Sequence, residues 1–348
     1  YLGWIREDNL QVETLNGGEY TADSGLALQS AVKKPLNITY DYTYAQVKDE
    51  VIAGIKKIDG LDVVIPTWFS VENAQGDIRD RGDIRYVENY AKLGVATWGY
   101  LDNSFDPELT HQFLQNEEAR KKAVSTYVNF AKSYGMKGVN IDFENIKVED
   151  RDALTTFVRE VAEEARAANL LVSVCVTPQI SKNVENELYD RKALAEICDY
   201  VVLMAYDQHW GSSEKAGSVA EYKWVEGNIN LSLKDIPPEK FILSVPFYAR
   251  LWKEGDKGLT SSAVGMKTTA DYVTAHGLNP TWDDEAKQYT IEQSVNGKSE
   301  KIWIENAESV SWKVSLMRKY NLAGISSWRL GFETPDVWGA MADQFSKY

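Results

Sequence analysis

The feature that most constrains the fold of this chain is a regular alternation of short strand-like segments with longer helical ones. The strand-like segments are rich in β-branched and aromatic residues, which favour extended structure. The clearest helical segment covers residues 151–170, where Leu154, Phe157, Val158 and Val161 recur at three- and four-residue spacing. Eight strands that alternate with helices predict a (β/α)8 barrel, or TIM barrel, of the α/β class. The expected strands are Leu36–Thr43, Leu61–Phe69, Leu93–Tyr100, Lys137–Glu144, Leu170–Pro178, Asp199–Asp207, Phe241–Arg250 and Ala323–Gly331.

Two segments fall outside this alternation and set the expected domain organisation. Residues 1–30 look like a strand followed by a polar linker, which we interpret as an N-terminal extension, the tail of a preceding small β-domain. Residues 251–320 are far too long for an ordinary connection to the next strand. They hold a helical stretch and two strand-like runs joined by "SVNGKSE", where Asn-Gly is a strong hairpin signal. We therefore predict a small α+β insertion at 251–320, between strands seven and eight of a barrel domain that covers 31–250 and 321–348.

Charge and hydropathy exclude several classes of partner. The formal net charge of -14 argues against nucleic acids and anionic membrane surfaces, which bind basic patches. No stretch approaches the roughly 18 apolar residues of a membrane-spanning helix. The chain begins at Tyr1, which suggests a piece of a longer protein and leaves a removed secretion signal open. Its 11 Trp and 19 Tyr suit either a packed core or stacking against sugar rings.

The cysteines and histidines show no metal-binding pattern. Cys175 and Cys198 lie near consecutive expected strands, so one disulfide is open, but we favour two buried free thiols. His111, His209 and His276 are scattered without ligand spacing, which argues against a zinc site. We expect no metal and no cofactor.

The stretch "KGVNIDFENI", residues 137–146, carries the strongest chemical signal. Because side chains alternate faces along a strand, Asn140, Asp142 and Glu144 share one face and the apolar residues share the other. In a barrel the polar face lines the interior, and Glu144 lies at the C-terminal end, where barrel active sites form. Two carboxyls this close should titrate as a coupled pair, with one proton retained near neutrality, as a general acid requires. A structural ion pair is the alternative, but this face has no Lys or Arg, and unpaired buried carboxylates are costly.

Four motifs on four expected strands together resemble glycoside hydrolase family 18, the chitinase-like barrels. "GVNIDFE" at 138–144 resembles the family signature Asp-Gly-x-Asp-x-Asp-x-Glu of strand four. "LMAYD" at 203–207 is similar to the Met-x-Tyr-Asp of strand six, and "PFYAR" at 246–250 to the Pro-x-Tyr-Gly-Arg of strand seven. "GISSWRLG" at 324–331 supplies Trp328, like the Trp that floors the sugar site of the family. The resemblance covers about residues 35–348, including the insertion.

Two positions depart from the family signature. Lys137 stands where the signature begins with Asp, and Asn140 replaces the middle Asp. Asn140 cannot share a proton with Asp142 as a second carboxyl would, so the pH profile of a chitinase need not transfer. "DFEN", together with "PTWF" on strand two, is most similar to a bacterial branch that includes spore-cortex-lytic and other cell-wall glucosaminidases.

The resemblance implies a retaining hydrolase of β-linked N-acetylglucosamine polymers, such as chitin or peptidoglycan, that works by substrate-assisted catalysis. Glu144 would be the proton donor and later the base. Asp142 would hold the N–H of the substrate acetamide and offset the charge of an oxazolinium intermediate. Tyr206 would orient the acetamide oxygen, and Trp328 would stack under the sugar at the cleavage site.

Weaker candidates for substrate binding surround these residues. They are the inward-facing amide Asn140, the polar residues Asp207, Arg250 and Tyr248 near the ends of strands six and seven, and two tryptophans, Trp98 and Trp68, near the ends of strands three and two. The tryptophans suit sugar platforms or core packing equally well. Arg250 is equally suited to a structural ion pair.

Two other functions remain open from the sequence. A chitinase-like lectin would bind sugar without cutting, but such relatives lose the terminal Glu, and this chain retains Glu144. An endo-glycosidase on N-glycan cores would share every catalytic residue. We expect a monomer that acts on an N-acetylglucosamine-containing polysaccharide, outside the cell or at the cell envelope or spore.

Overall fold

The computed structural model describes residues 35–179, 187–255, 258–295 and 298–348. The N-terminal extension predicted for residues 1–30 lies outside these described residues.

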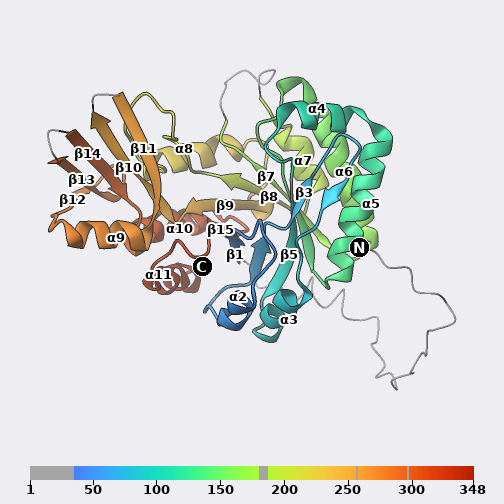
Figure 1. Ribbon diagram of the computed structural model, residues 1–348, viewed down its shortest axis with the longest axis horizontal. Helices are drawn as coiled ribbons and strands as arrows, with labels where there is room; N and C mark the ends of the chain where they lie inside the picture. The colour runs from blue at the N-terminus through green and yellow to red at the C-terminus, as the bar shows by residue number, and fades with distance from the viewer. Residues whose placement is uncertain (1–34, 180–186, 256–257, 296–297) are drawn as a thin grey trace. The chain divides into compact units, whose positions relative to one another are not determined.

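Eight parallel strands form a closed barrel, which confirms the predicted fold (Figure 1). Each strand pairs with its neighbour in parallel, and the β2–β5 pairing completes the ring. Two short strands, β3 (Phe69–Val71) and β4 (Ile78–Arg79), extend the sheet beside β5. The barrel strands are β1 (Leu36–Asp41), β2 (Val63–Pro66), β5 (Ala96–Asp102), β6 (Gly138–Asp142), β7 (Leu171–Val176), β8 (Tyr200–Met204), β9 (Phe241–Pro246) and β15 (Gly324–Trp328).

Helices follow the strands and cover the barrel with their apolar faces. The predicted helix at 151–170 is α6, Arg151–Ala167, whose Phe157 stacks on Phe143 at 5.3 Å between ring centroids. Burying one such ring stabilises the fold by about 1.5–3 kcal/mol. Asp106 accepts hydrogen bonds from the first turn of α4, as an N-cap should. The other helices of the barrel are α2 (Asp49–Gly54), α3 (Ile84–Lys92), α4 (Pro107–Gln115), α5 (Glu117–Ser133), α7 (Arg191–Ile197), α8 (Tyr222–Ser232), α10 (Ala307–Tyr320) and α11 (Asp336–Ser346), with short 3-10 turns at Val148–Asp150 and Pro238–Lys240.

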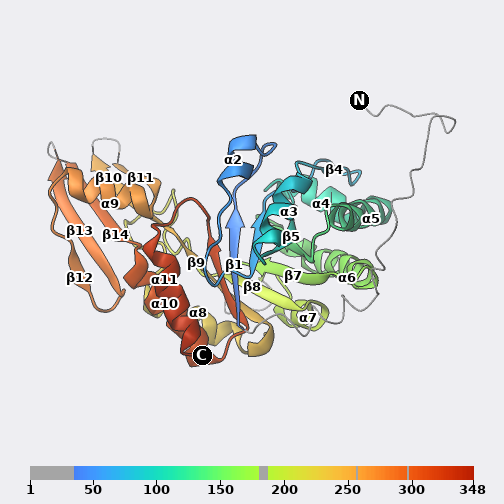
Figure 2. The ribbon, with the colours of Figure 1, turned by 90° about the horizontal axis from the view of Figure 1, so that it is seen from below.

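The predicted α+β insertion is a five-stranded antiparallel sheet and one helix between β9 and β15. Figure 2 shows it beside α10 and α11, on the side of the barrel away from α4 to α7. The expected hairpin around Asn-Gly is the antiparallel pair β13–β14. The sheet has the order β11-β10-β14-β13-β12. Its elements are β10 (Tyr248–Gly255), β11 (Gly258–Gly265), α9 (Met266–Ala275), β12 (Thr281–Asp283), β13 (Gln288–Val295) and β14 (Lys298–Ile304).

Two of the differences between expected and observed strand ends affect the site. Strand seven ends at Pro246, and Tyr248 and Arg250 belong instead to β10, the first strand of the insertion sheet. The continuous apolar and aromatic run across Phe247 hid this break. Strand three extends to Asp102 rather than ending at Tyr100, which puts Trp98 in the middle of the strand.

Two further findings concern the cysteines and the membrane. Cys175 and Cys198 are both buried free thiols, as favoured from the sequence. Among the helices of the described ranges, none combines the length and the apolar character that a bilayer crossing requires.

Candidate active site

The polar face of β6 points into the barrel, as the alternation of its residues predicts. Val139, Ile141 and Phe143 pack in the layer between barrel and helices. Asp142 is therefore the last residue of β6, and its side chain faces the barrel interior. Glu144 follows two residues later at the C-terminal mouth of the barrel. Lys137 precedes β6 and is exposed at the opposite end of the barrel, so its departure from the family signature does not touch the acids.

Asp142 is a buried carboxyl that is only partly satisfied. Its Oδ2 accepts a hydrogen bond from the Tyr100 hydroxyl at 3.0 Å, and the residue is 4% exposed. Its Oδ1 is buried and has no hydrogen-bond partner among the residues described, although the Cys175 thiol, a weak donor, lies beside the carboxyl. Burial raises the pKa of Asp142 to about 7, the Tyr100 hydrogen bond opposes that rise, and the charge of Asp102 adds to it.

Glu144 is held at the barrel mouth through its backbone. The side-chain amide of Asn103 accepts from the Glu144 N–H at 3.1 Å and donates to the Glu144 carbonyl at 2.7 Å. Burial first, and then the charges of Asp142, Asp207 and Asp102, raise the pKa of Glu144 to about 8. The acid pair therefore retains a proton at neutral pH, which is the state a general acid needs.

Two tyrosines, Tyr206 just after β8 and Tyr248 at the start of β10, close the site on another side. Tyr206 follows β8, and its pKa is raised well above the ordinary value by burial and by the nearby Asp142, so its hydroxyl stays protonated and can donate. Its ring meets Tyr248 edge to face at 6.2 Å. The Tyr248 hydroxyl donates to Asp207 Oδ1 at 2.7 Å, so two of the predicted substrate-binding residues hold each other in place.

Trp328 ends β15 at the same mouth of the barrel and remains partly exposed. Its ring lies 5.8 Å from that of Tyr40 and 6.4 Å from that of Tyr42. Arg250 is half-buried on β10 and donates from Nε to the Ser261 hydroxyl at 2.8 Å. A role for Arg250 at the sugar therefore stays a prediction.

Three predicted substrate-binding residues are enclosed in the core, and we correct those assignments. Trp98 is 1% exposed and stacks on Tyr200 inside the barrel at 5.9 Å. Trp68 is fully buried and packs against Tyr86 at 5.2 Å. Asn140 is also fully buried, one layer below Asp142, and donates to the Ser173 hydroxyl at 2.8 Å. The two rings and the amide are packed against other core side chains, so we no longer propose them as sugar-binding groups.

Sequence reasoning missed three residues at the end of β5. Tyr100 and Asp102 point inward beside Asp142, and Asn103 holds Glu144. The sequence does contain a signal for them. In "WGYLDN" the large side chains occupy alternate, inward-facing positions, and polar residues follow at the end of the strand. Ending the predicted strand at Tyr100 concealed it.

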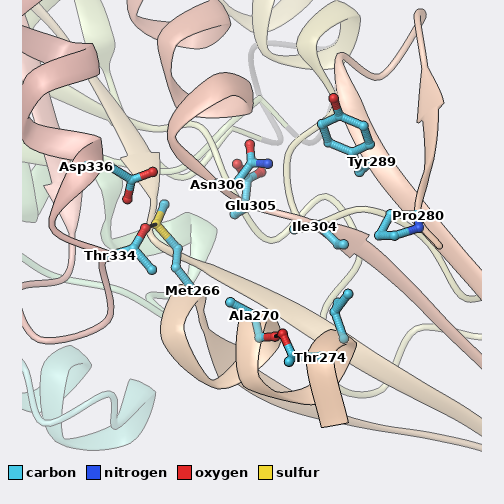
Figure 3. A pocket seen from close by; sticks show the side chains of 11 residues that line it. Met266, Ala270, Thr274, Pro280, Tyr289, Ile304, Glu305, Asn306, Thr334 and Asp336 are labelled. Carbon is cyan, nitrogen blue, oxygen red and sulfur yellow. Dashed lines mark hydrogen bonds between the residues drawn. The ribbon is translucent and has the colours of Figure 1, made fainter. Parts of the chain in front are cut away.

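A separate cavity of about 400 Å³ lies between the insertion and the last two helices (Figure 3). Its lining is mainly apolar, with Met266 from α9 and Ile304 from β14, and Asp336 from the start of α11 adds a carboxyl. The acids of β6 take no part in its lining. This cavity is distinct from the site at the barrel mouth.

The site can carry out acid–base chemistry through carboxyls. Among the residues placed by the structure, no group of three or more His, Cys, Asp or Glu could hold a metal ion. A closed parallel barrel with an acid pair at its C-terminal mouth fits the class of barrel glycosidases.

The particular family follows from comparison with known proteins. The chain belongs to the glycosyl hydrolases family 18, whose family model matches residues 56–333. The resemblance noted from the four motifs is thereby confirmed, and the protein is a glycoside hydrolase.

The relatives include bacterial glycosylases, spore cortex-lytic enzymes and animal chitobiases. The glycosylase YvbX of Bacillus subtilis is 28% identical over 81% of this chain and 84% of its own length. The cortical fragment-lytic enzyme of Bacillus anthracis is 27% identical over 80% of this chain and 67% of its own length. The crystal structure of the spore cortex-lytic enzyme SleL of Bacillus cereus has the same fold, with a TM-score of 0.79 at 21% identity, over 89% of this chain and 74% of that one.

Proposed function

We propose that the protein is a retaining hydrolase of β-linked N-acetylglucosamine polymers that works through an oxazolinium intermediate. One observation carries the proposal. The buried Asp142 has an oxygen without a partner among the described residues, next to a Glu144 that retains a proton at neutral pH. A buried carboxylate oxygen is costly to leave unpaired, and the N–H of a substrate acetamide would satisfy it.

In the first step, Glu144 gives its proton to the glycosidic oxygen while the bond from that oxygen to the anomeric carbon breaks. The acetamide oxygen of the same sugar attacks the anomeric carbon from the opposite face and forms the oxazolinium ring. Asp142 accepts the acetamide N–H and offsets the positive charge. Tyr206 donates to the acetamide oxygen and orients it for attack.

In the second step, Glu144 is a carboxylate and takes a proton from water. The water oxygen attacks the anomeric carbon, the ring opens, and the acetamide is restored. Two inversions leave the original β configuration. Trp328 forms the floor under the sugar, while Asp207, Tyr248 and Arg250 bind its hydroxyls.

The substrate class and the location come from the relatives and the site together. The names of the relatives refer to the spore cortex, so we favour peptidoglycan and a cell-envelope, spore-associated or extracellular location. A lectin is disfavoured because a sugar-binding site has no need for a proton on Glu144. Endo-glycosidase action on N-glycan cores uses the same catalytic residues, so only the substrate that is cleaved distinguishes it from the proposed function.

The test is product analysis by mass spectrometry after incubation with chitin oligomers, peptidoglycan and N-glycans, with the anomer of the new reducing end followed by NMR. We expect cleavage beside N-acetylglucosamine with an initial β-anomer. An initial α-anomer, or binding without cleavage of any of the three, would contradict the proposal.

A further inference from the structure

The interior of the barrel below Asp142 lacks the second carboxyl that would share its proton. The residue one layer down β6 is Asn140, which donates to Ser173 Oγ and has no exposed surface. An amide carries no charge, so nothing on β6 below Asp142 raises its proton affinity electrostatically.

A carboxyl does lie at the level of Asp142, on the neighbouring strand. Asp102 is the register partner of Asp142 in the parallel β5–β6 pair and is 7% exposed. Parallel neighbours are about 4.8 Å apart, so the two carboxyls share one region of the barrel mouth. Asp102 is held in place by the Ser70 hydroxyl at 3.0 Å and the Ser104 N–H at 2.7 Å.

A tyrosine pair lies between these two carboxyls. The hydroxyl of Tyr44 lies 3.2 Å from that of Tyr100, which donates to Asp142 Oδ2 at 3.0 Å. The Tyr44 hydroxyl also favours the ionised form of Asp102 and so lowers its pKa. Asp102 and Asp142 therefore interact through space, with the Tyr44–Tyr100 pair beside them.

We propose that Asp102 is a positioning residue for the acid pair: its carboxylate supplies the negative charge beside Asp142 that keeps a proton on the pair, a role that Asn140 cannot fill. This inference rests on the proposed function and identifies the charge that keeps its general acid protonated.

The other groups that face Asp142 carry no charge at working pH, and Asp207, a further carboxyl, acts on Glu144. Tyr40 from β1, Tyr100 from β5, Cys175 from β7 and Tyr206 after β8 all have raised pKa values because they are buried, and they stay neutral at working pH. Tyr189 and Tyr44 are also neutral neighbours for the same reason.

Burial raises the pKa of Asp102, but several neighbours oppose that rise. The Ser104 N–H, the Ser70 and Tyr44 hydroxyls and the charge of Arg81 all favour its ionised form. The charge of Asp102 also raises the pKa of Glu144, after the larger effects of Asp142 and Asp207.

The test compares pH profiles of kcat/KM for the wild type, Asp102→Asn and Ser70→Ala on a fluorogenic N-acetylglucosamine oligomer. Losing the negative neighbour lowers the pKa of the acid pair, so the alkaline limb of Asp102→Asn should move down by about one pH unit. At pH 8.5 its activity should fall about tenfold relative to the wild type, and at pH 5.5 it should change little. Ser70→Ala keeps the charge of Asp102 and should leave the limb in place.

A compensating variant separates this role from a merely structural one. Asp102→Asn combined with Asn140→Asp places a carboxyl below Asp142 instead of beside it, and the alkaline limb should return towards that of the wild type. A uniform loss of activity with an unmoved limb in Asp102→Asn would overturn the inference. Absence of turnover in the wild type would instead overturn the proposed function.

Thermal unfolding gives a readout that does not depend on activity. The wild type should lose stability as the pH rises from about 4 to 8, because these carboxyls ionise near pH 4 in the unfolded chain but only near pH 7 and 8 in the folded protein. Asp102→Asn should lose less over the same range. An equal loss in both proteins would also overturn the inference.

Discussion

Replacing Asp142 with Asn should stop turnover while leaving the fold intact. The amide has the shape of the carboxyl and can still accept from Tyr100, whose hydroxyl lies 3.0 Å from Oδ2. It cannot carry the charge that offsets the oxazolinium, and its NH2 group would face the N–H of the acetamide.

The expected loss follows from two contributions. A unit charge about 5 Å from the oxazolinium contributes about 3 kcal/mol at an effective dielectric constant of 20. A hydrogen bond to a charged acceptor contributes about 1.5–3 kcal/mol. A sum of about 5 kcal/mol corresponds to a loss of roughly 10³- to 10⁴-fold in kcat.

The assay is kcat on a fluorogenic N-acetylglucosamine oligomer, together with the melting temperature at pH 5 and pH 9. Burial raises the pKa of Asp142 to about 7, so stability in the wild type is fully present near pH 4 and is lost as the pH rises through 7. Asn cannot ionise, so the variant should melt at least as high as the wild type at pH 9. A loss of less than about tenfold in kcat, with a folded protein, would refute the role of Asp142.

Two further variants test the sugar floor and the packing of the barrel. Trp328→Ala should raise KM about tenfold by removing a stacking face, whereas alanine at Trp312, exposed on the outer helix α10, should not change it; equal KM values in both would contradict the floor. Lys313→Met should lower the free energy of unfolding by about 3–5 kcal/mol in urea titration, because it leaves the fully buried Glu305 carboxylate unpaired. The matched change at exposed Lys121 should cost less than about 1 kcal/mol, and similar costs at the two sites would contradict the argument.

The barrel and its acid strand could be predicted because their signals are local and periodic. The alternation around Asp142 specifies an inward polar face whichever strands lie beside it. Tyr206 and Trp328 could be proposed from the sequence because each lies in a recognisable motif at a strand end.

What the sequence could not show is which inward residues are covered by others. Trp98 and Trp68 look the same in sequence as exposed platforms, but Tyr200 and Tyr86 cover them through pairings between distant segments. The role of Asp102 also depends on register, since only the β5–β6 pairing places it opposite Asp142.

Glu144→Gln tests the central claim most directly. The Asn103 bonds that hold residue 144 involve only its backbone, so the amide should occupy the same place without a proton to give. We predict that turnover of N-acetylglucosamine oligomers falls at least about 10²- to 10⁴-fold, the contribution of a general acid, while calorimetry shows oligomer binding within about threefold of the wild type. Near-normal turnover by a folded Glu144→Gln protein would contradict the assignment of Glu144 as the proton donor.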